Sequence, residues 1–74
     1  MQLPDRITVD KEVRSGRPII LGTRVPVDLI LGKLAGGMSY EEVIAEYAIT
    51  REDILAALDY AAQLVSEERL HLAV

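Results

Sequence analysis

Three arginines in the first third of the chain, Arg14, Arg17 and Arg24, are the residues whose type and spacing best fit a chemical role. Guanidinium groups bind phosphates through several N–H donors at once. Because the three cluster around a short apolar run and its exit, we interpret them as candidate DNA contacts. For Arg24 a structural alternative stays open, in which it caps helix carbonyls or pairs with an acidic residue of a later helix.

Catalytic and metal chemistry are not indicated. Nucleophilic catalysis needs a base beside a Ser, Thr or Cys, but the chain has no cysteine and a single histidine, His71. The same composition cannot supply a zinc cage. The segment from Gly16 to Gly22 lacks the register and the lysine of a phosphate-binding loop. The sequence therefore predicts a protein that is not an enzyme and has no cofactor and no metal.

Length and composition predict one small domain over residues 1–74. Half of the 74 residues are hydrophobic, yet there is no Phe or Trp and there are only three Tyr, so the core is expected to be aliphatic. A chain this short buries only about 60% of its unfolded surface. Without disulfides or a metal, self-association is the expected supplement to its stability. We therefore predict a homodimer or a higher homo-oligomer.

The charge of the chain is divided between its two halves. Residues 1–33 carry six basic and four acidic residues, whereas residues 34–74 carry two basic and eight acidic residues. An anionic partner should therefore meet the first half, and a basic partner the second. No segment reaches the ~20 apolar residues that span a membrane, and the first residues do not resemble a signal peptide. We expect a cytoplasmic protein that does not bind membranes.

The arginines are predicted to lie on a β-hairpin within residues 6–23. Residues 6–10 alternate polar and apolar side chains and are rich in β-branched residues, which indicates a strand. Residues 18–21 form a short apolar run between Pro and Gly and are the expected antiparallel partner. The polar residues 10–16 are the expected loop. Two such strands are hardly stable alone, so they must pack on helices or pair across a dimer.

Three helices are predicted within residues 26–72. Apolar residues recur at helical spacing in the first two: Val27, Ile30, Leu31 and Leu34, then Tyr40, Val43, Ile44 and Tyr47. Gly36 and Gly37 end the first helix, and capping signals at Ser39 and Thr50 begin the other two. The third helix is expected to reach about Leu70, with an inner face of Ile54, Leu55, Leu58, Ala61, Ala62 and Val65.

The short link between the second and third helices has the length of a helix-turn-helix. The predicted fold is therefore mainly α, a three-helix helix-turn-helix or homeodomain-like domain preceded by a short N-terminal β-hairpin. A recognition helix would point Arg51, Glu52 and Asp53 at the bases. Since carboxylates oppose binding to phosphates, the third helix is not expected to act in this way.

The third helix also has more apolar residues than one small core can use. A surplus apolar stripe on a short domain typically marks an interface, and tyrosine is enriched at such surfaces. The candidate residues for a partner or dimer interface are Tyr60, Leu64, Leu70 and Leu72.

Three motifs carry a resemblance to a known family. They are Pro18-x-Ile20-x-Gly22-Thr23-Arg24-Val25-x-Val27, Gly37-Met38-Ser39-x-Glu41-Glu42-Val43, and Thr50-x-Glu52-Asp53-Ile54-x-Ala56-Ala57-Leu58-x-Tyr60-Ala61. Over roughly residues 6 to 62 the chain resembles the prokaryotic family filed as domain of unknown function 433. One departure is Ser15-Gly16, where that family typically has paired glycines.

The resemblance implies a helix-turn-helix or homeodomain-like fold and, for many members, the role of antitoxin in a type II toxin–antitoxin module. The implied partner is a PIN-like ribonuclease toxin. We therefore expect an antitoxin whose C-terminal helix and tail meet the toxin, with Glu67 and Glu68 facing a basic surface, and whose arginines contact operator DNA. The alternatives are a stand-alone DNA-binding transcriptional regulator and a structural dimerisation module.

Overall fold

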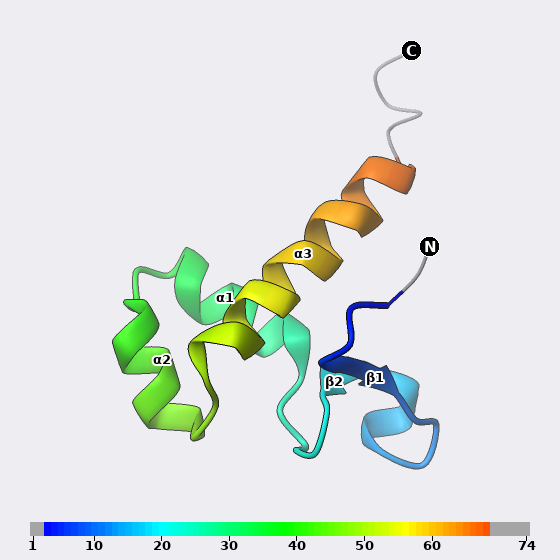
Figure 1. The fold of residues 1–74 in the computed structure, drawn as a ribbon, viewed down its shortest axis with the longest axis horizontal. Helices are drawn as coiled ribbons and strands as arrows, with labels where there is room; N and C mark the ends of the chain where they lie inside the picture. The colour runs from blue at the N-terminus through cyan, green and yellow to red at the C-terminus, as the bar shows by residue number, and fades with distance from the viewer. Residues whose placement is uncertain (1–2, 69–74) are drawn as a thin grey trace.

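Two short strands and three helices make up the fold of residues 3–68, which the computed structural model describes. Along the chain they are β1 (Ile7–Val9), a single 3-10 turn (Arg14–Gly16), β2 (Pro18–Ile20), α1 (Val27–Ala35), α2 (Tyr40–Tyr47) and α3 (Arg51–Glu68). Figure 1 shows α1 and α2 on one side of α3 and the hairpin near the lower end of α3. The predicted mainly α fold with an N-terminal hairpin is confirmed.

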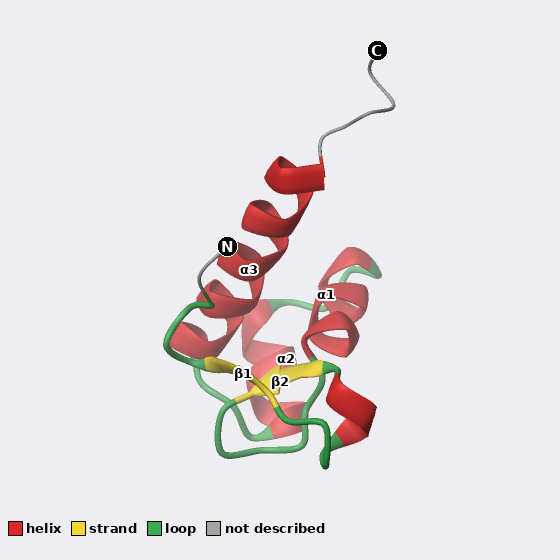
Figure 2. Ribbon diagram, turned by 90° about the vertical axis from the view of Figure 1, so that its right-hand side faces the viewer, coloured by secondary structure: helices red, strands yellow, loops and turns green. Residues whose placement is uncertain are grey.

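The hairpin depends on the helices for its stability. β1 and β2 pair antiparallel, with Ile7 opposite Ile20 and Val9 opposite Pro18. Both isoleucines are buried, and β1 contacts α3 while β2 contacts α1 (Figure 2). Because a pair of three-residue strands is not stable in water alone, this packing holds the hairpin in place.

The loop between the strands has an unusual backbone. Arg14, Ser15 and Gly16 have φ angles of 54°, 57° and 81°. Glycine adopts positive φ freely, whereas a residue with a Cβ does so at a cost of about 1–2 kcal/mol. The departure from paired glycines at Ser15 therefore falls on a backbone position that favours glycine.

The first two helices begin and end where the sequence predicts. Gly37, with φ of 106°, follows the end of α1. At the start of α2, the Ser39 N–H donates to the Glu42 side chain at 2.8 Å, and the Glu42 N–H donates to the Ser39 hydroxyl at 3.1 Å. This reciprocal capping box satisfies two backbone donors that the helix leaves unpaired. Both predicted apolar stripes lie inward, with their remaining members half-buried around the buried Val27, Ile30 and Val43.

The link from α2 to α3 has the geometry of a helix-turn-helix turn. Ala48 ends α2 in the left-handed conformation, with φ of 55° and ψ of 44°, and Ile49 is buried. Thr50 then caps α3. The Thr50 N–H donates to the Asp53 carboxylate at 3.0 Å, and the Asp53 N–H donates to the Thr50 hydroxyl at 3.1 Å. The second predicted cap is confirmed.

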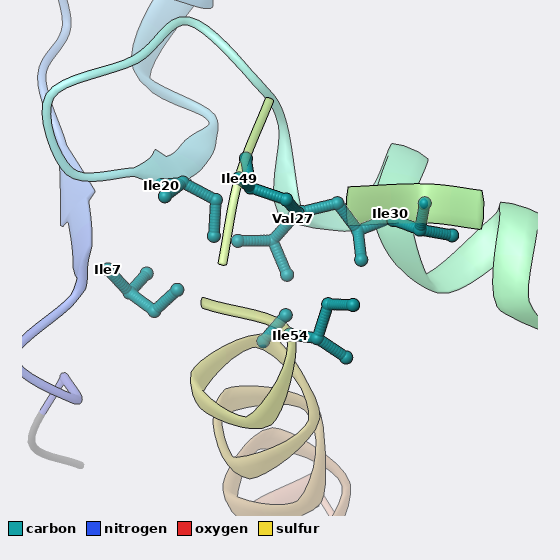
Figure 3. Close-up of a cluster of buried hydrophobic side chains, with 8 residues drawn as sticks. Ile7, Ile20, Val27, Ile30, Ile49 and Ile54 are labelled. Atoms are coloured by element: carbon teal, nitrogen blue, oxygen red, sulfur yellow. The ribbon is translucent and has the colours of Figure 1, made fainter. Parts of the chain in front are cut away.

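The core is aliphatic, as predicted. Figure 3 shows side chains from β1, β2, α1, the α2–α3 link and α3 converging on one cluster. Among the described residues, the largest completely buried side chains are Ile20, Ile30, Ile54, Val27 and Val43. The three tyrosines are half-buried at the edge of this cluster. No described helix is long and apolar enough to cross a bilayer.

The predicted inner face of α3 is wrong in most positions. Ile54 is buried and Ala61 is half-buried, but Leu55, Leu58, Ala62 and Val65 are exposed, and Ala57 takes the core position instead. The reason is that α3 carries two apolar stripes, and periodicity cannot say which one meets the core. In the structure Ile54, Ala57 and Asp53 face inward, and Asp53 bonds there to Thr50 and Arg6.

Candidate functional site

Arg24 lies on a tight turn that the motif Gly22-Thr23-Arg24 builds. Gly22 has a φ of 81°, which glycine accepts without cost. The Thr23 hydroxyl donates to the Ile20 carbonyl at 2.8 Å and accepts from the Val25 N–H at 2.9 Å. The side chain of Thr23 therefore fixes the turn from both sides, and Arg24 is left exposed at its end.

The three arginines differ in their partners. Arg17 forms an ion pair with Asp28 in the first turn of α1, and both side chains are more than half exposed. An exposed pair of this kind contributes only about 0–1 kcal/mol. Within residues 3–68, Arg14 and Arg24 form no ion pair and no side-chain hydrogen bond. Within residues 3–68, Arg24 therefore neither caps helix carbonyls nor pairs with an acidic residue of α2 or α3. The structural alternative for Arg24 is wrong for this part of the chain.

The arginine-bearing segments lie at one end of the molecule. The β1–β2 loop, which carries Arg14, and the turn that carries Arg24 are both at the end opposite the C-terminal end of α3 (Figures 1 and 2). A ligand held by these arginines would leave the far part of α3 open to a second partner.

The first turn of α3 is occupied by internal contacts. Asp53 is buried and accepts from Arg6 at 3.2 Å across to the hairpin, so it could not approach the bases as a recognition helix would require. Arg51 lies over the ring of Tyr40, 5.0 Å from its centre, a cation–π geometry. This turn joins the hairpin, α2 and α3, and these internal contacts account for its charged residues without any ligand.

An apolar groove of about 300 Å³ lies between α1 and the C-terminal half of α3. Leu31 lines it from α1, and Tyr60, Leu64 and Val65 line it from α3, with the Arg17–Asp28 pair on its wall. Two of the four predicted interface residues, Tyr60 and Leu64, therefore share one surface. Leu70 and Leu72 lie outside the described residues. The structure brings Arg17 to the wall of this groove.

A second apolar surface on α3 faces solvent. We call it the outer stripe, and it consists of Leu55, Leu58, Ala62 and Val65. Their spacing of three, four and three residues places them on one side of the helix. Sequence reasoning assigned these residues to the core. The signal that could have identified the surface was the presence of two stripes on a helix that has only one core to meet.

The described residues hold no group of three His, Cys, Asp or Glu side chains that could bind a metal ion. Their buried side-chain nitrogens and oxygens all have hydrogen-bond partners. What the arrangement offers is contact: the exposed Arg14 and Arg24, a groove between α1 and the C-terminal half of α3, and a stripe of apolar side chains along α3.

Comparison with known proteins places this arrangement in a family. The family described as "Protein of unknown function (DUF433)" matches residues 7–61. The crystal structure of a DUF433 member from Anabaena variabilis is 30% identical with a TM-score of 0.78, over 88% of this chain and 65% of that one. The crystal structure of Rv2018 from Mycobacterium tuberculosis is 29% identical with a TM-score of 0.65, over 70% of this chain and 24% of that one.

No curated protein matches the chain. The chain spans somewhat less than two thirds of the Anabaena protein and about a quarter of Rv2018. The match over residues 7–61 includes the hairpin, the Gly22-Thr23-Arg24 turn, both capping boxes and the proximal part of α3. The chain therefore belongs to the DUF433 family of proteins of unknown function.

Proposed function

We propose that this chain is an antitoxin that binds and neutralises a PIN-like ribonuclease toxin in the cytoplasm, without catalysis of its own. The observation that carries the proposal is the open apolar groove between α1 and the C-terminal half of α3. The class of toxin comes from the family resemblance of the three sequence motifs. The groove supplies the surface that such a partner would cover.

The groove favours an apolar side chain flanked by polar groups. Leu64 is 38% exposed and Val65 is 67% exposed, so both have apolar area left to bury, at about 25 cal/mol per Å². At the wall of the groove, the exposed pair can donate hydrogen bonds through Arg17 and accept them through Asp28. The acidic second half of the chain, with Glu67 near the end of α3, favours the approach of a basic nuclease surface.

Co-expression with any small nuclease that a neighbouring reading frame encodes tests the proposal. The native chain should restore growth and co-purify with the nuclease. Leu64→Asp places a carboxylate in the groove and should weaken the complex at least tenfold, which is about 1.4 kcal/mol. Ser66→Asp is the matched control, because it adds the same charge at an exposed polar position two residues on.

Ser66→Asp should neutralise the nuclease as the native chain does, and circular dichroism should show all three proteins equally helical. Equal neutralisation by Leu64→Asp would remove the groove from the interface. The absence of any neighbouring nuclease that co-purifies would remove the antitoxin assignment itself.

A second function, binding of operator DNA, is favoured by Arg14 and Arg24. Both are exposed, and both lack an ion pair within residues 3–68. Phosphate contacts by such residues supply the sequence-independent part of DNA affinity. The chain would then hold DNA at one end and the toxin at the other.

Titration of a fluorescent duplex carrying the chain's own promoter, at several salt concentrations, tests this second function. Arg14→Glu and Arg24→Glu should each weaken binding and lower the salt slope by about 0.9 for the lost phosphate contact. Arg17→Glu should do less, because Asp28 already offsets its charge. Lys33→Glu is the control: it changes the net charge equally at the far end of α1.

Unchanged affinity in both Arg14→Glu and Arg24→Glu would exclude these residues as DNA contacts. Salt-dependent promoter binding by a chain that has no nuclease partner would instead favour the stand-alone regulator.

A further inference from the structure

The segment that carries Arg24 is a closed loop of backbone hydrogen bonds. Residues 20–23 form a type II turn, in which the Thr23 N–H donates to the Ile20 carbonyl at 3.0 Å and the glycine in the third place has a positive φ. The Ile20 N–H also donates to the Val25 carbonyl at 3.0 Å. The chain therefore leaves β2 and returns to the same point within six residues, with Arg24 inside the loop.

The hydroxyl of Thr23 adds two bonds to this loop, and one of them spans Arg24. It donates to the Ile20 carbonyl at 2.8 Å and accepts from the Val25 N–H at 2.9 Å. The residues on both sides of Arg24 are thus tied to each other through one side chain. As a result the backbone of Arg24 is fixed, although its guanidinium is exposed and forms no ion pair within residues 3–68.

Arg14 provides an internal comparison. It is also exposed, but it lies in the β1–β2 loop, to which Thr23 forms no hydrogen bond in the described part of the chain. The side-chain bond within that loop is the one that the Asp10 carboxylate accepts from the Glu12 N–H at 2.9 Å. A change at Thr23 therefore alters the presentation of Arg24 and leaves that of Arg14 as it is.

We propose that Thr23 is a positioning residue for Arg24 and holds it ready to contact a DNA phosphate. The proposal rests on the DNA-binding function proposed above. An arginine loses much conformational freedom when it binds, and a backbone that is already fixed lowers this cost. Thr23 acts only through Arg24, so its hydroxyl should contribute to DNA affinity only while Arg24 is present.

Titration of the fluorescent promoter duplex with Thr23→Val tests the proposal. Valine has nearly the same shape as threonine but no hydroxyl, so the Val25 N–H loses its acceptor. Thr23→Val should weaken DNA binding by about threefold to tenfold, although it changes no charge. Thr23→Ser keeps the hydroxyl and should bind the duplex as the native chain does.

Double variants distinguish positioning from a general loss of structure. Thr23→Val should have no further effect in a chain that carries Arg24→Ala, and its full effect in a chain that carries Arg14→Ala. A loss of structure would weaken both chains by the same factor. Circular dichroism under the titration conditions measures the folded fraction of each variant, and the DNA affinities are compared per folded chain.

Gly22→Ala perturbs the same turn without removing the hydroxyl. A Cβ at Gly22 would meet no atom within 4 Å, so the effect of the methyl group comes from the φ of 81° alone. Gly22→Ala should weaken DNA binding in the native and Arg14→Ala chains and have no effect in the Arg24→Ala chain. Gly32→Ala, which also adds a methyl group in open space, is the control and should leave DNA affinity unchanged.

Two results would overturn the role of Thr23 alone. They are equal effects of Thr23→Val in the Arg24→Ala and Arg14→Ala chains, and native affinity of Thr23→Val in a series where Arg24→Ala binds more weakly. A native chain that does not bind the duplex would overturn the DNA-binding function itself, and the role of Thr23 with it. The two failures are therefore distinguishable.

Discussion

The two halves of α3 have similar apolar content but opposite environments. In the first half, Ile54 and Ala57 are 0% exposed. In the second half, Leu64 is 38% exposed and Val65 is 67% exposed. One helix thus provides the centre of the core at its beginning and an uncovered surface at its end. The difference teaches that apolar residues on a single helix in a small domain can serve folding in one part and association in another.

The difference follows from what surrounds each half. The first half is held by the Thr50–Asp53 cap, by the ion pair of Asp53 with Arg6, and by packing on β1, α1 and α2. At 18 residues, α3 is about 27 Å long, twice the length of α1, so its second half extends past the elements that could cover it. The exposure of Leu64 and Val65 results from that excess length.

Replacement of a core residue in the first half should give the largest effect. Ile54→Ala removes a completely buried side chain and should lower the free energy of unfolding by about 2–5 kcal/mol. Val65→Ala, in the second half, should change the unfolding of the monomer by no more than about 0.5 kcal/mol. Urea denaturation at concentrations where the chain is monomeric measures both. Equal losses would show that the second half is as well packed as the first.

Much of the fold could be predicted from local signals. Ser39 and Thr50 are residues with a capping hydroxyl three positions before a carboxylate, and Gly36-Gly37 favour the end of a helix, so the starts of α2 and α3 and the end of α1 could be predicted. The isoleucine core followed from the absence of large aromatics. Such signals act through the backbone within one helical turn, which is why they survive the formation of tertiary structure.

The face of α3 and the groove could not be predicted in this way. Both depend on the rotation of α3, which the contact between Arg6 and Asp53 helps to set across 47 residues of sequence. A pattern within one helical turn cannot reveal a contact between two residues so far apart in the sequence. Tyr60 and Leu64 were identified as interface residues, but their common groove with Leu31 and Arg17 arises only when α1 and β2 pack against α3.

Removal of Asp53 should have the next largest effect, because it fixes this rotation. Asp53→Ala leaves the Thr50 N–H without its acceptor and Arg6 without its partner, and should cost about 2 kcal/mol. Asp59→Ala, at an exposed position one and a half turns on, is the control and should cost almost nothing. If both variants unfold at the same urea concentration, Asp53 does not anchor the first half of α3.

Glycine at the α2–α3 turn should stabilise the domain by a smaller amount. Ala48 has a φ of 55°, a conformation that glycine adopts without the steric cost of a Cβ. Ala48→Gly should therefore raise the free energy of unfolding by about 1 kcal/mol. Ala45→Gly, inside α2, is the control and should lower it by about as much. A loss of stability in Ala48→Gly would mean that the turn relaxes around the methyl group.

Gly32→Ala has the smallest expected effect on stability, and it tests whether α1 is part of the binding surface on α3. Gly32 lies inside α1, is exposed, and has no atom within 4 Å of the position a Cβ would occupy. A methyl group at this position would therefore meet no other atom of the described chain. Gly32→Ala should raise the free energy of unfolding by about 0.5–1 kcal/mol. Gly37→Ala, at a φ of 106°, is the control and should lower it.

Gly32→Ala also tests whether α1, in addition to α3, contacts the nuclease. Gly32 follows Leu31, the residue through which α1 lines the groove. If Gly32→Ala gains stability and still neutralises the nuclease, the exposed side of α1 lies outside the interface and the second half of α3 carries the binding. A variant that gains stability but loses the nuclease would show that the partner approaches α1 closely at this glycine, and the interface would extend from α3 onto α1.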